Sequence, residues 1–133
     1  MSFDPRAIFA NLAEKEKFKG HHSAEGRTIR MLSRAMSGWS TNNLSARDVL
    51  VLCDQAMEDW LKSRLKISGW STPSFPTLLE KAVLKELISR TDAVELQKIH
   101  NARSRAQGSG GDVSGGKAQS ALELCIQIVE KFW

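Results

Sequence analysis

Apolar residues recur every three or four positions along most of this chain, and no stretch alternates strictly between apolar and polar residues. The longest such pattern runs from about residue 45 to residue 67; its apolar members are Val49, Leu52, Cys53, Ala56, Met57, Trp60, Leu61 and Leu65. This spacing places side chains on one face of an α-helix, whereas a half-buried strand needs a period of two. We therefore expect an all-α protein, an up-and-down helical bundle without strands.

The pattern also gives the expected order of elements. Helices are predicted over residues 5–19, 23–37, 45–67, 78–88, 92–107 and 117–132, with a flexible glycine-rich loop over 108–116. Ser45 with Asp48 resembles a capping box, and Asp92 with Glu95 predicts a second helix start of the same kind. The 133 residues are expected to form one domain, with an N-terminal helical arm (1–40) and a helical bundle (45–133).

The sequence Ser-Gly-Trp-Ser-Thr occurs twice, at 37–41 and at 68–72, without further similarity between the flanking residues. A glycine after a helix can take the left-handed conformation that ends it, and the next side chain can pack back on the last turn. We therefore interpret Gly38 and Gly69 as helix ends, with Trp39 and Trp70 packing back. A tryptophan-lined ligand or partner surface is the alternative.

Charge and cysteine usage favour a cytoplasmic protein. Lys and Arg outnumber Asp and Glu by nineteen to fifteen, but the two signs are mostly interleaved, as on a solvated surface. Cys53 and Cys125 each lie in an apolar helical pattern and are expected to be free, buried thiols. No segment has the length and hydropathy of a membrane span. No cofactor or metal is expected, because His21 and His22 have no third ligand nearby.

One helix face is distinctly basic. Arg27, Arg30 and Arg34 lie opposite the apolar stripe of the helix predicted over 23–37. This face is either a solvated surface or a contact for an anionic partner such as RNA. The N-terminus of the last predicted helix, at Gly115-Gly116-Lys117, could also hold an anion weakly.

The helix predicted over 92–107 places His100, Arg103 and Gln107 on one stripe that borders its apolar face. An arginine so close to the core stays charged, and burying it without a partner is costly. Arg103 therefore needs a carboxylate, a set of helix-end carbonyls, a partner chain or a bound phosphate. Three acidic residues could supply the carboxylate from within the chain: Asp54, Glu58 and Glu80.

Residues 96–108, Leu-Gln-Lys-Ile-His-Asn-Ala-Arg-Ser-Arg-Ala-Gln-Gly, resemble the signature segment of HEPN domains. In that family a helix of the form Leu-x-x-Leu-His-x-x-Arg-Asn leads to a downstream His. The order of elements from Ala46 to Phe132 is also similar. The resemblance implies a dimeric helical bundle whose Arg and downstream His meet in a cleft between subunits, where active members cleave RNA without a metal. Arg103 matches the family Arg.

The sequence departs from that pattern at two positions. Ser104 stands where the family has Asn, Gly108 stands where it commonly has His, and no His follows His100. Without this titratable group, nuclease activity of the family kind is not expected. We therefore expect a noncatalytic, HEPN-like dimerisation or binding module. Its binding residues would contact a second subunit, a partner protein or an anionic ligand such as a nucleotide or RNA: Arg103, His100, Gln107, Ser104 and Arg105.

Two alternatives belong to other classes of protein. In the first, the chain is a metal-independent ribonuclease, such as the toxin of a toxin–antitoxin pair, and His100 or an unusual residue replaces the missing His. In the second, it is an RNA-binding adaptor that uses Arg27, Arg30 and Arg34.

Overall fold

The computed structural model describes residues 24–67, 73–109 and 113–131. These residues form helices joined by loops, without a strand, so the predicted all-α bundle is confirmed. The helices are α2 (Ala24–Ser40), α3 (Ala46–Arg64), α4 (Phe75–Leu84), α5 (Arg90–Ser109) and α6 (Gly115–Lys131). The expected helix over 5–19, the pair His21-His22 and the second tryptophan motif at 68–72 lie outside the described residues.

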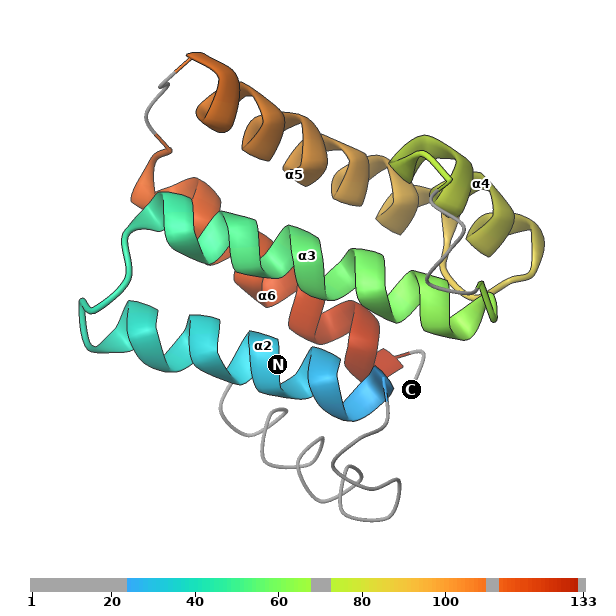
Figure 1. Ribbon diagram of the computed structural model, residues 1–133, viewed down its shortest axis with the longest axis horizontal. Coiled ribbons are helices and arrows are strands. Elements are labelled where there is room, and N and C mark those ends of the chain that lie inside the picture. Colours follow the sequence, from blue (N-terminus) through green and yellow to red (C-terminus); the bar gives the residue numbers. More distant parts are fainter. Residues whose placement is uncertain (1–23, 68–72, 110–112, 132–133) are drawn as a thin grey trace.

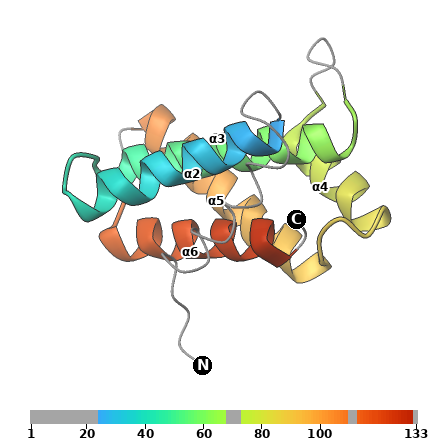
Figure 2. The same ribbon diagram turned by 90° about the horizontal axis from the view of Figure 1, so that it is seen from below.

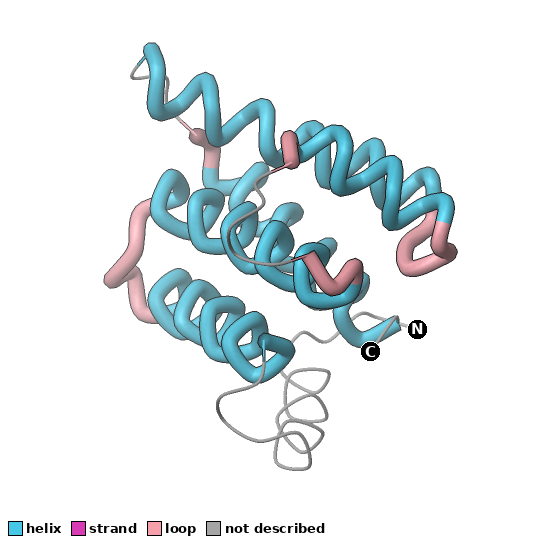
Figure 3. Tube along the Cα trace, turned by 45° about the vertical axis from the view of Figure 1, so that its right-hand side comes forward, coloured by secondary structure: helices cyan, strands magenta, loops and turns pink. Residues whose placement is uncertain are grey.

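Helix α3 is the centre of the bundle. It packs against α2, α4, α5 and α6, and α2 also packs against α6. Figure 1 shows α2 and α5 on opposite sides of α3, with successive long helices running in opposite directions. Figure 2 shows α6 as a separate layer beneath α2 and α3, with α4 at one end. The described loops lie at the helix ends (Figure 3).

The core explains why α3 takes this position. Its buried residues form one broad face of the helix: Val49, Leu50, Cys53, Asp54, Ala56, Met57, Trp60 and Leu61. A buried face this broad is stable only when several elements pack against it. Helix α2 contributes Ile29, Leu32 and Ala35 to the same core, so the described part of the expected N-terminal arm is one layer of the bundle.

The start of α3 follows the sequence signal. The Ser45 hydroxyl accepts a hydrogen bond from the Asp48 backbone N–H, and the Asp48 carboxylate accepts one from the Ser45 N–H. The predicted capping box is confirmed. The start of α5 was predicted wrongly at Asp92. It lies at Arg90, because the Ser89 hydroxyl accepts from the Asp92 N–H and caps the helix one turn earlier.

The helix ends differ from the prediction at Gly38. Helix α2 continues through Gly38 to Ser40, and the left-handed residue is Asn42, with φ of 58°. The Asn43 N–H reaches back to the Gly38 carbonyl at 2.8 Å, which is the Schellman pattern. Lys66 and Glu86 take the same conformation after α3 and α4. Helix α4 therefore ends at Leu84 and not at Ile88.

The glycine-rich loop is also shorter than predicted. Gly108 lies inside α5, and Gly115 and Gly116 form the first turn of α6. Ser114 caps α6, because its hydroxyl accepts from the Lys117 backbone N–H at 3.2 Å. This cap occupies one of the donors that an anion at the helix N-terminus would need.

Trp39 packs on the bundle but not as a helix end. Its indole Nε1 donates to Gln119 Oε1 of α6 at 2.7 Å, and its ring lies against Gly115. The tryptophan therefore ties the C-terminal turn of α2 to the N-terminal half of α6.

Cys53 and Cys125 are free and fully buried, as predicted. The two thiols meet between α3 and α6, and a hydrogen bond with Cys53, followed by burial, raises the pKa of the Cys125 thiol well above its ordinary value. The thiolate of Cys125, which is its reactive form, is therefore disfavoured in the folded protein. In the residues that the structure describes, no helix is long and apolar enough to cross a membrane.

We expect Gly38→Ala to destabilise the protein and Gly116→Ala to stabilise it. A Cβ at Gly38 would overlap the Leu44 side chain, whereas a Cβ at Gly116 meets nothing within 4 Å. Urea denaturation should show a loss of about 1–3 kcal/mol for the first variant. The second should gain up to about 1 kcal/mol from the lower chain entropy of alanine. Equal effects of the two substitutions would contradict the close contact between Gly38 and Leu44.

We also expect both cysteines to be inert in the native protein. A thiol reagent at pH 8 should label Cys53 and Cys125 only as fast as the whole domain unfolds, and labelling in denaturant should be immediate. The pKa of Cys125 is raised in the folded state, so the buried thiol contributes fully to stability below the ordinary thiol pKa. This contribution is lost as the pH rises from the ordinary thiol pKa through the folded-state pKa. Rapid labelling of the folded protein would show that the two thiols are accessible.

Candidate functional site

A buried carboxylate joins α3 to α5. Asp54 lies in the middle of α3 with 1% of its side chain exposed, and Arg103 Nη1 donates to its Oδ2 at 2.9 Å. His100 Nδ1 lies 3.2 and 3.1 Å from the two oxygens of the same carboxylate. We call Asp54, His100 and Arg103 the polar cluster.

The helical repeat brings the cluster together. His100 and Arg103 are one turn apart on the stripe of α5 that contains the buried Leu96. On α3, Asp54 interrupts an apolar stripe that contains Leu50 and Met57. Packing of these two stripes places the carboxylate against His100 and Arg103 of α5.

Phe75 holds the imidazole from the other side. It is the first residue of α4, and its ring stacks on His100 with 4.4 Å between centroids and 13° between planes. Sequence reasoning did not find Phe75, because nothing in the local pattern indicates that the start of α4 meets the middle of α5. Asp54 could be singled out in the sequence, because it is an acidic residue on the otherwise apolar stripe of α3.

Arg103 forms its ion pair with Asp54, which is one of the three acids that the sequence offered as partners. Glu58 instead lies 3.7 Å from Lys62 on the same helix, and Glu80 is exposed on α4. A buried carboxylate without partners would cost several kcal/mol, roughly 3–5 by analogy with broken buried ion pairs.

The cluster has a defined chemical arrangement. An ionised carboxylate only accepts hydrogen bonds, so the contact with Asp54 assigns the proton of a neutral His100 to Nδ1 and leaves Nε2 as the acceptor. The side chains of His100 and Arg103 are 31% and 21% exposed. His100 and Arg103 therefore reach the surface, while the buried Asp54 holds both side chains in place.

The remaining residues expected around Arg103 are not all brought to it. The Ser104 hydroxyl donates to the His100 carbonyl at 3.1 Å and is exposed. Arg105 lies on the opposite flank of α5. The side chain of Gln107 lies outside the described residues.

Arg27, Arg30 and Arg34 are exposed along α2, as predicted. They lie far from the polar cluster, because α3 separates α2 from α5 (Figure 1). Arg34 also lines a shallow depression of about 250 Å³ at the end of α2. The two basic surfaces found in the sequence are therefore separate surfaces of the protein.

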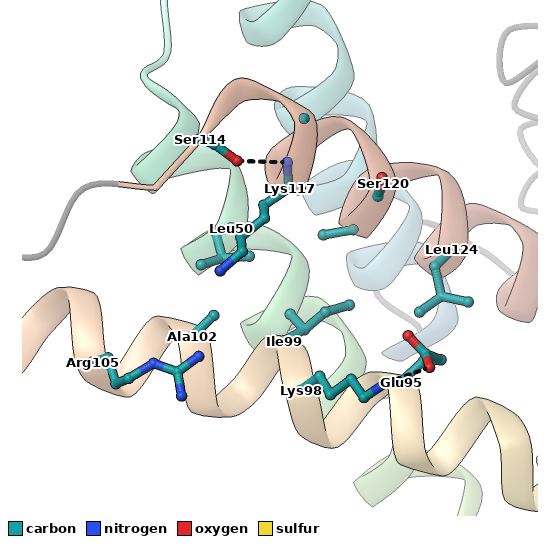
Figure 4. A pocket seen from close by; sticks show the side chains of 12 residues that line it. Leu50, Glu95, Lys98, Ile99, Ala102, Arg105, Ser114, Lys117, Ser120 and Leu124 are labelled. Carbon is teal, nitrogen blue, oxygen red and sulfur yellow. Dashed lines mark hydrogen bonds and ion pairs between the residues drawn. The ribbon is translucent and has the colours of Figure 1, made fainter.

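A groove of about 820 Å³ opens on the other flank of α5, between α5 and α6. Its floor is apolar and its walls carry charged and hydroxyl side chains (Figure 4). The lining consists of Leu50, Glu95, Lys98, Ile99, Ala102, Arg105, Ser114, Gly116, Lys117, Ser120, Ala121 and Leu124. The described residues contain no group of His, Cys, Asp or Glu side chains that could hold a metal.

We expect Asp54→Ala to lower the free energy of unfolding by about 3 kcal/mol, because Arg103 and His100 then lose their buried partner. Glu58→Ala, which removes a more exposed ion pair of the same helix, should cost less than about 1 kcal/mol. Urea denaturation of both variants checks the difference. Similar losses would mean that the polar cluster does not fasten α5 to α3.

Comparisons with models of protein families, with curated proteins and with solved structures found no match for this chain.

Proposed function

We propose that this chain is a noncatalytic, HEPN-like binding module of the cytoplasm that forms a homodimer. The surface of α5 around Arg103 and His100 would contact a second subunit, a protein partner or an anionic ligand such as a nucleotide or RNA. The observation that carries the proposal is the anchoring of both side chains by Asp54.

Anchoring matters because binding costs entropy when side chains must be ordered. Arg103 has five N–H donors in a rigid fork, and Asp54 holds the guanidinium by Nη1. The orientation of the fork is thus fixed before a partner arrives, which lowers the cost of recognition. Phe75 fixes the ring of His100 in the same way.

The charge balance argues against strong use of Arg103 as a phosphate clamp. The negative charge of Asp54 offsets the positive charge of Arg103, because Asp54 Oδ2 lies 2.9 Å from Arg103 Nη1. Little net charge therefore remains to attract an RNA phosphate. Partners that recognise the cluster by shape and hydrogen bonds, above all a second protein surface, fit this balance best.

One observation favours the ribonuclease alternative. Asp54 orients His100 through Nδ1, as a base in a catalytic dyad requires, and Arg103 lies one turn away. In that mechanism His100 Nε2 would accept the proton of the attacking 2′-hydroxyl, and Arg103 would stabilise the charge on the phosphate.

Light scattering at about 100 µM tests the dimer; obligate partners should be associated at this concentration. We expect a mass of twice the 14.8 kDa chain. Arg103→Lys keeps a cation beside Asp54 but loses the fork, so the dimer dissociation constant should rise about tenfold or more. Arg47→Lys on α3 is the matched control and should leave it unchanged. A strict monomer would refute the dimer.

Incubation with labelled RNA in EDTA separates the two classes of function. We expect no cleavage by the wild-type protein. Cleavage that disappears in both Arg103→Lys and His100→Gln would overturn the noncatalytic proposal in favour of the ribonuclease. RNA affinity at two salt concentrations then tests the arginines of α2: a steep salt slope that Arg34→Gln reduces would indicate the adaptor.

A further inference from the structure

Two apolar side chains project into solvent from neighbouring helices. Leu84, the last residue of α4, is 75% exposed, and Val94, in the second turn of α5, is 50% exposed. The other large apolar side chains that the structure describes are buried or half-buried. A single exposed leucine is common on a protein surface, but adjoining exposed apolar residues indicate a contact with another molecule.

Leu84 and Val94 belong to one surface, because α4 and α5 form a hairpin. Phe75 at the start of α4 stacks on His100, and a five-residue connection joins Leu84 to Arg90 at the start of α5. Since the two helices also pack together, α4 runs antiparallel to the N-terminal half of α5 (Figure 1). A hollow of about 320 Å³ lies between them, and Leu84 and Val94 both line it.

The floor of this hollow is apolar as well. Leu79 and Val83 line it from α4, and Ala93 lines it from α5. Leu79 is buried and the other two are half-buried, so apolar surface continues from the core outward to the two exposed side chains. We call the surface around this hollow the hairpin surface. A partner that covers it would remove Leu84 and Val94 from water.

Two opposite charges border the hairpin surface. Glu80 lies one turn before Leu84 on α4, and Arg90 lies one turn before Val94 on α5. Both are exposed, and neither side chain forms an ion pair or a hydrogen bond with another residue that the structure describes. Because the helices are antiparallel, Leu84 lies opposite Arg90 and Glu80 lies opposite Val94. The apolar pair thus occupies one diagonal of the surface, and the charged pair occupies the other.

This arrangement is complementary to itself. A two-fold axis along the apolar diagonal would place Leu84 and Val94 each against its counterpart in a second copy. The same rotation would bring Glu80 of each copy against Arg90 of the other. Isologous contacts of this kind form the commonest homo-oligomers. A different partner would have to supply two apolar groups and both charges in this pattern, whereas a second copy supplies them by symmetry.

We propose that two copies of this chain associate through the hairpin surface, with Leu84 and Val94 on the two-fold axis and reciprocal ion pairs between Glu80 and Arg90. The inference rests on the homodimer of the proposed function and adds the surface that forms it.

The hairpin surface adjoins the polar cluster. Gln97 lines the hollow and lies one turn before His100 on α5, so the two residues are neighbours on the helix. An interface of usual size, about 800 Å² per subunit, would extend from the hollow over His100 and Arg103.

Sedimentation equilibrium of charge-reversed variants tests the reciprocal pairs. Glu80→Arg and Arg90→Glu should each raise the dimer dissociation constant about tenfold or more, because like charges then face each other twice. An equimolar mixture of the two variants should return to within about threefold of the wild type, because the mixed dimer again pairs opposite charges. The matched controls, Glu130→Arg on α6 and Arg47→Glu on α3, are exposed and do not line the hollow, so each should leave association unchanged.

Cross-linking tests the position of the axis. Leu84→Cys should form a disulfide between two copies on oxidation with diamide, because the two thiols meet on the axis. The native cysteines are buried and do not compete. Gln127→Cys on α6 is exposed and lies away from the hollow, so it should cross-link at least about tenfold more slowly at the same protein concentration.

The outcomes separate this inference from the proposed function. A dimer that Arg103→Lys weakens but that neither charge reversal weakens would overturn the hairpin surface and leave the proposed dimer standing. A dimer that the mixture restores but that Arg103→Lys does not change would support the hairpin surface and exclude the polar cluster from the contact. Failure of the mixture to restore association, or equal cross-linking through Leu84→Cys and Gln127→Cys, would overturn the hairpin surface. A strict monomer would refute both.

Discussion

The arrangement of this bundle depends on one buried negative charge. Asp54 lies in the middle of the central helix, surrounded by apolar residues, and water cannot reach it. Its carboxylate is tolerated only where a cation and hydrogen-bond donors meet it, and α5 supplies both with Arg103 and His100. The register of α5 on α3 is thereby restricted, because a shift by one residue would move both donors away from Asp54.

This restriction explains the two different flanks of α5. One flank packs against α3 and α4. There Phe75 stacks on His100, and Arg103 donates a hydrogen bond to Asp54. The other flank is left facing α6, which is itself held by α2 and α3 and by the hydrogen bond from Trp39 to Gln119. Since neither helix can move toward the other without breaking these contacts, the groove between them stays open.

Much of the fold could be predicted from the sequence, because a helical period of apolar residues is a local signal. The capping box at Ser45 could also be predicted, because it depends only on two residues three positions apart. The end of α2 was predicted wrongly because Asn42, and not Gly38, takes the left-handed conformation. Gly38 is needed instead for the close approach of Leu44, a tertiary contact that no local pattern reveals. Likewise, Ser89 and Asp92 are both good caps, and only the structure shows which one is used.

The candidate site was predictable in part. The position of Arg103 beside the core showed that it needs a partner, but the choice among Asp54, Glu58 and Glu80 depends on how three helices are aligned. The groove was not found, although Lys98, Ala102 and Arg105 share one stripe of α5, because its other wall comes from α6. Sites formed between helices require the angle between them, and periodicity carries no information on that angle.

The two flanks of α5 differ in chemistry, and this difference limits which partners suit them. Asp54 offsets Arg103 from within the core, so the polar cluster offers fixed hydrogen-bond donors with little net charge. The groove has an apolar floor, and Glu95, Lys98, Arg105 and Lys117 line its walls. A protein surface can satisfy the first arrangement by complementary hydrogen bonds. The second offers apolar surface, from which a fully hydrated ligand would gain nothing.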